Sequence, residues 1–380
     1  MTPKDVHALA ISLDTSLFTH EYGSAMERQL EYAKKLGSYT LIVLNNKQKQ
    51  PLKSITQKNL KIIPTNSQTR WFYIVDALKI AKNIIQSNTI NVLTTQDPLI
   101  TGLIGVLLKK KYHLPLNIQL HSDYFNNLNW LRQSTQNLFL YPLGILILHQ
   151  ANSLRYDNKR KMKHPFIFNP KLTKKTYQAP MYINYSDFHQ TPKLKKDITR
   201  LISVGRLEWE KNFPMLITVV AQLIKQGKNI SLTIVGGGSL KNKLQHQINQ
   251  QRVQEKIKIT GFLKKNAVKK LLHQNDLFIL SSHYEGWAMV TMEALAAGLP
   301  VIMTNVGNAG ELVVNQKTGL VVPKDNPIAL KDAIQYALEH PKKMYQLAKV
   351  GQKKVYKNFS KNKLINAWIK CLYETAKIKT

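Results

Sequence analysis

One stretch in the second half of the chain limits the possible folds more than any other. The apolar run at residues 277–280 predicts a strand covered on both faces. A polar turn with Gly286 follows, and then a helix over residues 287–297 that glycine and proline end. The next apolar run, residues 301–303, predicts a second strand. Strands that alternate with helices in this way indicate an α/β protein with a parallel sheet.

Two carboxylates lie within this strand–loop–helix–strand unit. Glu285 precedes the helix, and Glu293 lies inside it, followed by the apolar residues 294–297. A helix this apolar is expected to be buried on most sides. Because a buried carboxylate is costly without hydrogen-bond donors, Glu293 either pairs with a local lysine or backbone group or binds a ligand diol.

The start of the same helix is a candidate anion site. The backbone N–H groups of Ala288, Met289 and Val290 follow the glycine turn. The first N–H groups of a helix have no acceptor within the helix, and the helix dipole is positive at this end. We therefore expect these groups to favour a bound phosphate.

These residues resemble the signature of a known family. The resemblance rests on Glu285-Gly286-Trp287, on the second glutamate after seven intervening residues, on Ala294, and on Gly298-Leu299-Pro300-Val301. The pattern is similar to that of the retaining glycosyltransferases of family 4, among the glycosyl transferases group 1, which use nucleotide-sugar donors. It implies that Glu285 is catalytic and lies against the donor sugar, and that Glu293 binds the ribose hydroxyls.

The resemblance also implies the fold. It is GT-B, an α/β fold of two facing Rossmann-like doubly wound domains with a C-terminal helix that returns to the first domain. The chain has 380 residues, which suits two or three domains of ordinary size. We expect an acceptor-side domain over residues 1–192 with the helix at 360–380, and a nucleotide-sugar-binding domain over residues 193–359.

Two loops that follow strands carry further residues of the resemblance. Residues 205–207 and 211–213 resemble the family's phosphate-binding pair, which assigns a diphosphate leaving group to Arg206 and Lys211. Arg206 is a planar, permanently charged donor, whereas Lys211 is a point charge. Two surface cations at a strand–helix turn are the alternative interpretation. The residues Gly261, Phe262 and Leu263 would contact the nucleobase through their backbone.

The first half of the chain supplies a histidine and a glycine. His121 follows the predicted strand 116–120, and ligands of open α/β sheets bind beyond the carboxyl ends of strands. His121-Ser122-Asp123 resembles the family's histidine motif, which implies a catalytic residue beside the donor sugar; a structural histidine is the alternative. Family members usually carry a Gly-Gly pair in the first loop. Here only Gly23 precedes Ser24, so Gly23 either contacts phosphate or is a turn glycine.

The formal net charge of +33 requires its own explanation. It suits nucleic acid, an anionic membrane or a polyanionic substrate as partner, and a lysine-rich solvated surface explains it equally well. No zinc spacing or nucleic-acid motif accompanies the charge, which argues against a dedicated nucleic-acid binder. The basic run at residues 155–164 is either a solvated loop or a contact with a membrane or acceptor.

Cysteine content and hydropathy bear on location. The single cysteine, Cys371, excludes a disulfide framework and favours a reducing cytosol. No signal peptide is visible, and the longest apolar stretch, residues 138–148, contains Pro142 and Gly144 and is too short to span a bilayer. We expect a cytoplasmic protein that binds peripherally to the inner face of the cell membrane.

The resemblance implies hexosyl transfer with retention of configuration. The donor would be UDP- or GDP-linked, the acceptor a glycan or lipid-linked molecule, and the context cell-envelope polysaccharide or glycolipid synthesis. No metal cluster is apparent, so cations and the helix dipole would stabilise the leaving group without metal or cofactor. The resemblance implies same-face attack, with a donor phosphate oxygen receiving the acceptor proton. The alternatives are a soluble sugar-phosphate or oligosaccharide synthase on this fold, and a basic polyanion-binding protein with an inactive fold.

Overall fold

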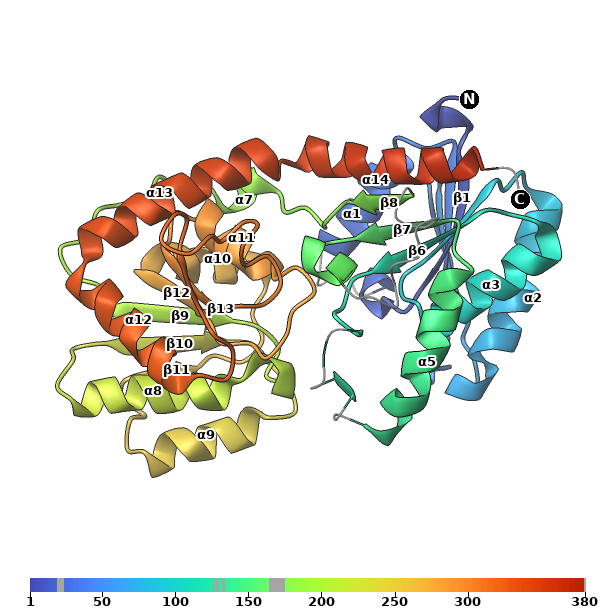
Figure 1. Cartoon of the computed structure of the whole chain (residues 1–380). Helices are drawn as coiled ribbons and strands as arrows, with labels where there is room; N and C mark the ends of the chain where they lie inside the picture. Colours follow the sequence, from blue (N-terminus) through green and yellow to red (C-terminus); the bar gives the residue numbers. More distant parts are fainter. Residues whose placement is uncertain (19–23, 126, 128–129, 132–133, 164–174, 379–380) are drawn as a thin grey trace. The chain divides into compact units, whose positions relative to one another are not determined.

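The computed structural model describes residues 1–18, 24–125, 127, 130–131, 134–163 and 175–378. The chain forms two compact units, Met1–Pro180 with Asn362–Thr380, and Met181–Lys361 (Figure 1). Residues 181–192, which the sequence places in the first domain, fall within the second unit. There Phe188 is buried and the backbone N–H of Gln190 donates to the carbonyl of Ala296 at 3.2 Å.

The first unit is an eight-stranded sheet in the order β3-β4-β2-β1-β5-β6-β7-β8. Its strands are β1 (His7–Ser12), β2 (Ser38–Val43), β3 (Ile55–Gln57), β4 (Leu60–Pro64), β5 (Val92–Thr95), β6 (Leu116–Leu120), β7 (Ser153–Tyr156) and β8 (Thr176–Gln178). Its α-helices are α1 (Ser24–Ala33), α2 (Tyr73–Ser87), α3 (Ile100–Tyr112), α5 (Thr135–His149) and α14 (Lys361–Ala376), with short 3-10 turns at η1 (Pro3–Asp5), η2 (Thr15–Phe18), η4 (Arg70–Phe72) and η5 (Lys159–Lys163). Pairing is parallel except between β3 and β4.

Alternating residues of β6 show how the layers form. Helices α2, α3 and α5 pack side by side, and a side chain at Gly105 of α3 would meet Leu116 of β6. The next residue, Asn117, points to the opposite face, because successive strand residues alternate. It donates from Nδ2 to Sγ of Cys371 in α14 at 3.2 Å. The C-terminal helix thus covers the face opposite α3.

The second unit is a fully parallel six-stranded sheet in the order β11-β10-β9-β12-β13-β14. Its strands are β9 (Arg200–Val204), β10 (Ser231–Val235), β11 (Ile257–Ile259), β12 (Leu277–Leu280), β13 (Val301–Thr304) and β14 (Leu320–Val322). Its helices are α7 (Tyr185–Phe188), η6 (Trp209–Lys211), α8 (Phe213–Lys225), α9 (Lys241–Gln250), α10 (Lys265–Gln274), α11 (Met289–Ala296), α12 (Pro327–Glu339) and α13 (Pro341–Asn358). The chain runs outward from β9 to β10 and β11 and then returns to β12 on the other side of β9. The carboxyl ends of β9 and β12 therefore form a topological switch point.

Candidate active site

The switch point of the second unit brings together two of the predicted site residues. Lys211 lies after β9 and Glu285 lies after β12, and Nζ of Lys211 is 2.6 Å from Oε1 of Glu285. Both side chains are largely buried, at 14% and 10% exposure. The same Oε1 accepts from Oγ of Ser282 at 2.7 Å, and Oγ of Ser281 donates to the carbonyl of Lys211 at 2.9 Å. A charged hydrogen bond this short is strong and fixes both side chains in place.

Arg206 lies on the same loop as Lys211 but faces solvent. Its side chain is 76% exposed, and Nη2 is 2.6 Å from Oε1 of Glu210. The guanidinium carries five N–H donors in a planar fork, so this one contact leaves others to bind an anion. The sequence did not indicate Glu210, whose side chain is only 11% exposed.

The helix that follows Glu285 begins with a strained residue. Ala288 has a φ of 60°, in the left-handed region that residues other than glycine rarely occupy. Its carbonyl accepts from Oγ1 of Thr291 at 2.7 Å and from Nδ2 of Asn308 at 3.3 Å. These contacts hold the turn, and the first N–H groups of α11, at Met289 and Val290, follow directly. Such strain is commonly maintained at ligand sites.

Glu293 differs from the sequence expectation. Its neighbours Met292 and Ala294 are fully buried, but Glu293 itself is only half-buried. Helix α11 is buried on most sides, as expected, but the Glu293 position is partly exposed and projects from it. A partly accessible carboxylate does not incur the full cost of burial.

Glycines shape the loops near the predicted base-binding residues. Gly261 follows β11 with a φ of 77°, and its carbonyl accepts from the N–H of Gly236 at 3.0 Å. A Cβ on Gly236 would lie 1.8 Å from the carbonyl oxygen of Gly205. The loops after β9, β10 and β11 thus pack directly against one another, with Phe262 half-exposed and Leu263 half-buried beside them.

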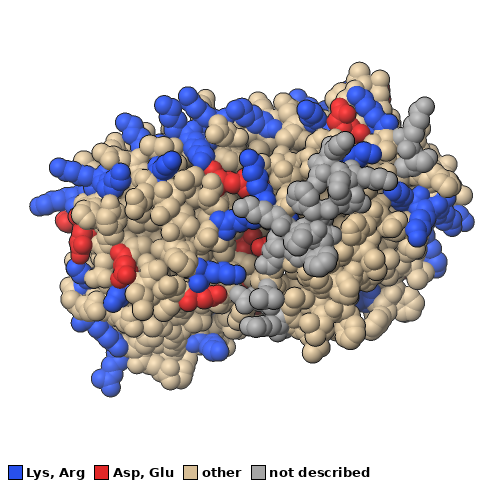
Figure 2. Space-filling view, viewed as in Figure 1, with Lys and Arg blue, Asp and Glu red and all other residues tan. Residues whose placement is uncertain are grey.

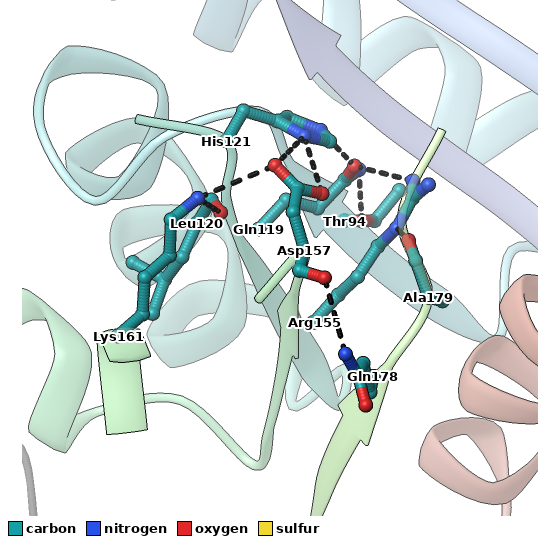
Figure 3. Close-up of polar contacts among 9 residues, drawn as sticks. All are labelled: Thr94, Gln119, Leu120, His121, Arg155, Asp157, Lys161, Gln178 and Ala179. Atoms are coloured by element: carbon teal, nitrogen blue, oxygen red, sulfur yellow. Dashed lines mark hydrogen bonds and ion pairs between the residues drawn. The ribbon is translucent and has the colours of Figure 1, made fainter. Parts of the chain in front are cut away.

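In the first unit, His121 belongs to a buried polar network (Figure 3). Its Nε2 is 2.7 Å from Oε1 of Gln119, which also accepts from Nη1 of Arg155 at 2.8 Å. Nε2 of Gln119 donates to Oγ1 of Thr94 at 3.0 Å. Turning the Gln119 amide over would place its NH₂ against the guanidinium of Arg155. The amide orientation is therefore fixed, and Nε2 of His121 must carry a proton.

The other ring nitrogen of His121 faces a carboxylate. Nδ1 lies 3.3 Å from Oδ1 and 3.4 Å from Oδ2 of Asp157. Burial lowers the pKa of His121, and the Asp157 carboxylate only partly opposes this effect. Burial alone would raise the pKa of Asp157, but the charges of Lys161 and His121 lower it to about 2. Asp157 is thus held as a carboxylate beside the ring.

The same network includes two cations of the basic run at residues 155–164. Arg155 and Lys161 are each only 3% exposed, and neither is a solvated or surface cation. Nζ of Lys161 donates to the carbonyl of Leu120 at 2.5 Å and lies 3.3 Å from Oδ2 of Asp157. Both interpretations of the run are wrong for these two residues. The sequence carried no signal for this burial, because only the strand paired with β7 determines which face Arg155 occupies.

The remaining predictions concern Gly23, a bound metal ion and a membrane-spanning helix. Gly23 lies outside the described residues. Among the described residues, no group of three or more His, Cys, Asp and Glu side chains could hold a metal ion. No helix in the described ranges has both the length and the apolar character needed to span a bilayer.

Comparison with known proteins shows similarity to glycosyltransferases. Residues 185–354 match the model of the family "Glycosyl transferases group 1". A glycogen synthase of Mycobacterium tuberculosis is 32% identical over 159 residues, which cover 42% of this chain and 38% of that protein. The N-acetylgalactosamine-N,N'-diacetylbacillosaminyl-diphospho-undecaprenol 4-alpha-N-acetylgalactosaminyltransferase of Campylobacter jejuni is 30% identical over 243 residues, 63% of this chain and 60% of that protein.

The fold is also found among solved structures. HepE of Anabaena, in complex with UDP and glucose, superposes with a TM-score of 0.75 at 14% identity, covering 97% of this chain and 100% of that one. Two Rossmann-like units with a C-terminal helix that packs on the first confirm the predicted GT-B fold class.

Proposed function

We propose that this chain is a retaining glycosyltransferase that moves a hexosyl group from a UDP- or GDP-linked sugar to a glycan or lipid-linked acceptor. The observation that carries the proposal is the contact between Lys211 and Glu285 at the switch point of the second unit. It joins a cation suited to a diphosphate and a carboxylate suited to a sugar, in the part of the chain that matches the glycosyl transferases group 1 model.

The chemical demand of this reaction is to stabilise the departing nucleoside diphosphate. Arg206, Lys211 and the N–H groups of Ala288, Met289 and Val290 supply positive charge and donors without a metal. Bound phosphate would share Lys211 with Glu285 and leave the carboxylate close to the transferred sugar. We assign the ribose hydroxyls to Glu293. The acceptor attacks from the face that the leaving group vacates, and a phosphate oxygen takes its proton.

The remaining assignments concern the base, the sugar and the acceptor. We assign the base to the backbone of residues 261–263 and the donor sugar to His121, which Gln119 and Asp157 hold in place. The name of the Campylobacter protein, which includes a lipid diphosphate, supports a lipid-linked acceptor. The UDP in the Anabaena structure supports a nucleoside diphosphate donor. We place the reaction in cell-envelope polysaccharide or glycolipid synthesis, at the inner face of the membrane.

A donor screen tests the proposal. Purified protein is incubated with a panel of UDP-, GDP- and ADP-sugars, with and without sugar-phosphate and lipid-linked acceptors, and released nucleoside diphosphate is measured. We expect release from one base class that Glu285→Gln abolishes. No release from any donor, together with thermal stabilisation by short DNA but not by nucleotides, would instead favour the polyanion-binding alternative. Transfer only to sugar phosphates would favour the soluble synthase.

A further inference from the structure

Helix α5 of the first unit leaves an apolar face in solvent. Phe139 is 79% exposed, Leu146 65%, Leu138 58% and Leu143 37%. Residues 139, 143 and 146 are spaced by three and four, so they form one stripe along the helix. Large side chains gathered on one exposed face indicate an interaction surface, whereas single exposed residues do not.

The opposite face of α5 already holds the helix in place. Gly144, Ile147 and Leu148 are buried, and a Cβ on Gly144 would lie 2.9 Å from the ring of Phe125. Helix α5 also packs beside α3 (Figure 1). The exposed stripe therefore has no role in fixing α5 in the unit, and its apolar character calls for a partner outside the described chain.

Lysines near the C-terminal end of α5 indicate the chemistry of that partner. Nζ of Lys109, in the last turn of α3, donates to the carbonyl of Gln150 at the end of α5 at 2.7 Å. Lys110 and Lys111 follow and are exposed. In the sequence, Asp123 is the sole acidic residue from 98 to 150. In Figure 2 the visible surface is rich in Lys and Arg, while the part over α5 is mostly uncharged.

We infer that the α5 surface, defined as Leu138, Phe139, Leu143 and Leu146 with Lys110 and Lys111, docks on an anionic lipid bilayer. An apolar helix face beside lysines matches a headgroup boundary, where apolar side chains enter the acyl region and cations meet lipid phosphates. The inference deepens the proposed function by naming the surface at which a lipid-linked acceptor would be met. The biological purpose of the docking depends on the proposed function, but vesicle binding can be measured without a turnover assay.

Vesicle co-sedimentation of the full chain tests the inference. The vesicles contain phosphatidylcholine alone or with phosphatidylglycerol. We expect binding to the anionic vesicles that weakens as salt rises, and a loss of about tenfold or more in affinity for the double variant Phe139→Ser, Leu146→Ser. The matched control is Ile328→Ser on α12, because Ile328 is 69% exposed but lies on the second unit. It should bind as the wild type does.

A second pair of substitutions separates charge from apolar contact. Lys110→Gln with Lys111→Gln should weaken binding to anionic vesicles and reduce its salt dependence. Undiminished vesicle binding by the Phe139→Ser, Leu146→Ser variant, or no binding of wild type to anionic vesicles, overturns the inference. Sedimentation velocity is measured on the same proteins. If the wild type is a dimer that Phe139→Ser, Leu146→Ser dissociates, while vesicle binding is unchanged, the surface binds a second copy of the chain instead. Vesicle docking by a protein that releases no nucleotide from any donor upholds the inference and rejects the proposed reaction.

Discussion

Replacing Arg155 by leucine should destabilise the first unit severely. The guanidinium is buried, donates from Nε to the carbonyl of Ala179 at 2.7 Å and from Nη1 to Gln119 at 2.8 Å, and lies 4.2 Å from the ring centroid of Trp368. The substitution removes all three contacts at once. It also leaves the buried carbonyl of Ala179 without this donor, whereas Oε1 of Gln119 keeps its contact with His121.

The magnitude follows from these contacts. Each hydrogen bond from a charged group contributes roughly 1.5–3 kcal/mol, and a desolvated cation–π contact contributes about 2 kcal/mol. The contributions overlap, and leucine regains part of the loss through its own apolar burial. We therefore expect a net loss of about 3–5 kcal/mol, as is found when one member of a buried charged network is removed.

Hydrogen exchange on peptides from β6 and β7, measured across a urea series, reports the stability of the first unit alone. With a urea dependence of about 1–3 kcal/mol per molar, the expected loss moves the unfolding midpoint by about 1 M or more. Lys110→Leu, at an exposed position, is the matched control and should change little. A loss below about 1 kcal/mol for Arg155→Leu would refute the reasoning and return Arg155 to the role of a solvated cation.

Three further predictions concern the proposed site. His121→Ala should lower turnover more than it weakens nucleotide binding, since His121 is assigned to the sugar; calorimetry paired with turnover checks this, with circular dichroism as folding control. The pKa of Asp157 is lowered to about 2, so its contribution is complete above about pH 4 and lost as pH falls toward 2. The fall in urea midpoint from pH 5 to pH 3 should therefore be smaller in Asp157→Asn, and an equal fall argues against the network. Excess EDTA should leave turnover unchanged, because Arg206 and Lys211 are proposed to neutralise the leaving group; a loss restored by Mg²⁺ or Mn²⁺ contradicts this.

Many of the helices and strands were predictable, because the spacing of apolar residues and the residues that end each element indicate the same boundaries. Residues 116–120 and 277–280 were expected as strands, and the structure contains them as β6 and β12. In each, the apolar run is bounded by glycine, proline or a strand-end polar residue, so local and tertiary preferences agree. Helix α5 was harder to place, because Pro142 lies inside it and its apolar residues lie on all sides.

The contacts within the site were harder to predict from the sequence than the residues that form them. The sequence indicated Glu285 and Lys211 separately, but their 2.6 Å contact depends on the order of β9 and β12 in the sheet. It indicated His121 without Gln119, Arg155 or Asp157, because this network joins neighbouring strands that are about 35 residues apart in sequence. Runs of charge cannot distinguish a buried cation from a solvated one, as Arg155 illustrates, since only the paired strand determines which face a residue occupies.

The two glutamates provide the most direct test of the proposed glycosyl transfer. Glu293 is assigned to the ribose, a contact that donor and free nucleotide share, so Glu293→Ala should weaken binding of nucleoside diphosphate about ten- to hundredfold. Glu285 is assigned to the sugar, which free nucleotide lacks. Glu285→Gln should therefore nearly keep nucleotide affinity while turnover collapses.

Calorimetric titration of the wild type and both variants with the preferred nucleoside diphosphate, with turnover measured on the same samples, is the decisive measurement. The account predicts lost affinity for Glu293→Ala, and retained affinity with lost turnover for Glu285→Gln. Lost affinity in Glu285→Gln with retained affinity in Glu293→Ala would reverse the two roles. Wild-type behaviour of both variants would contradict the proposed site altogether.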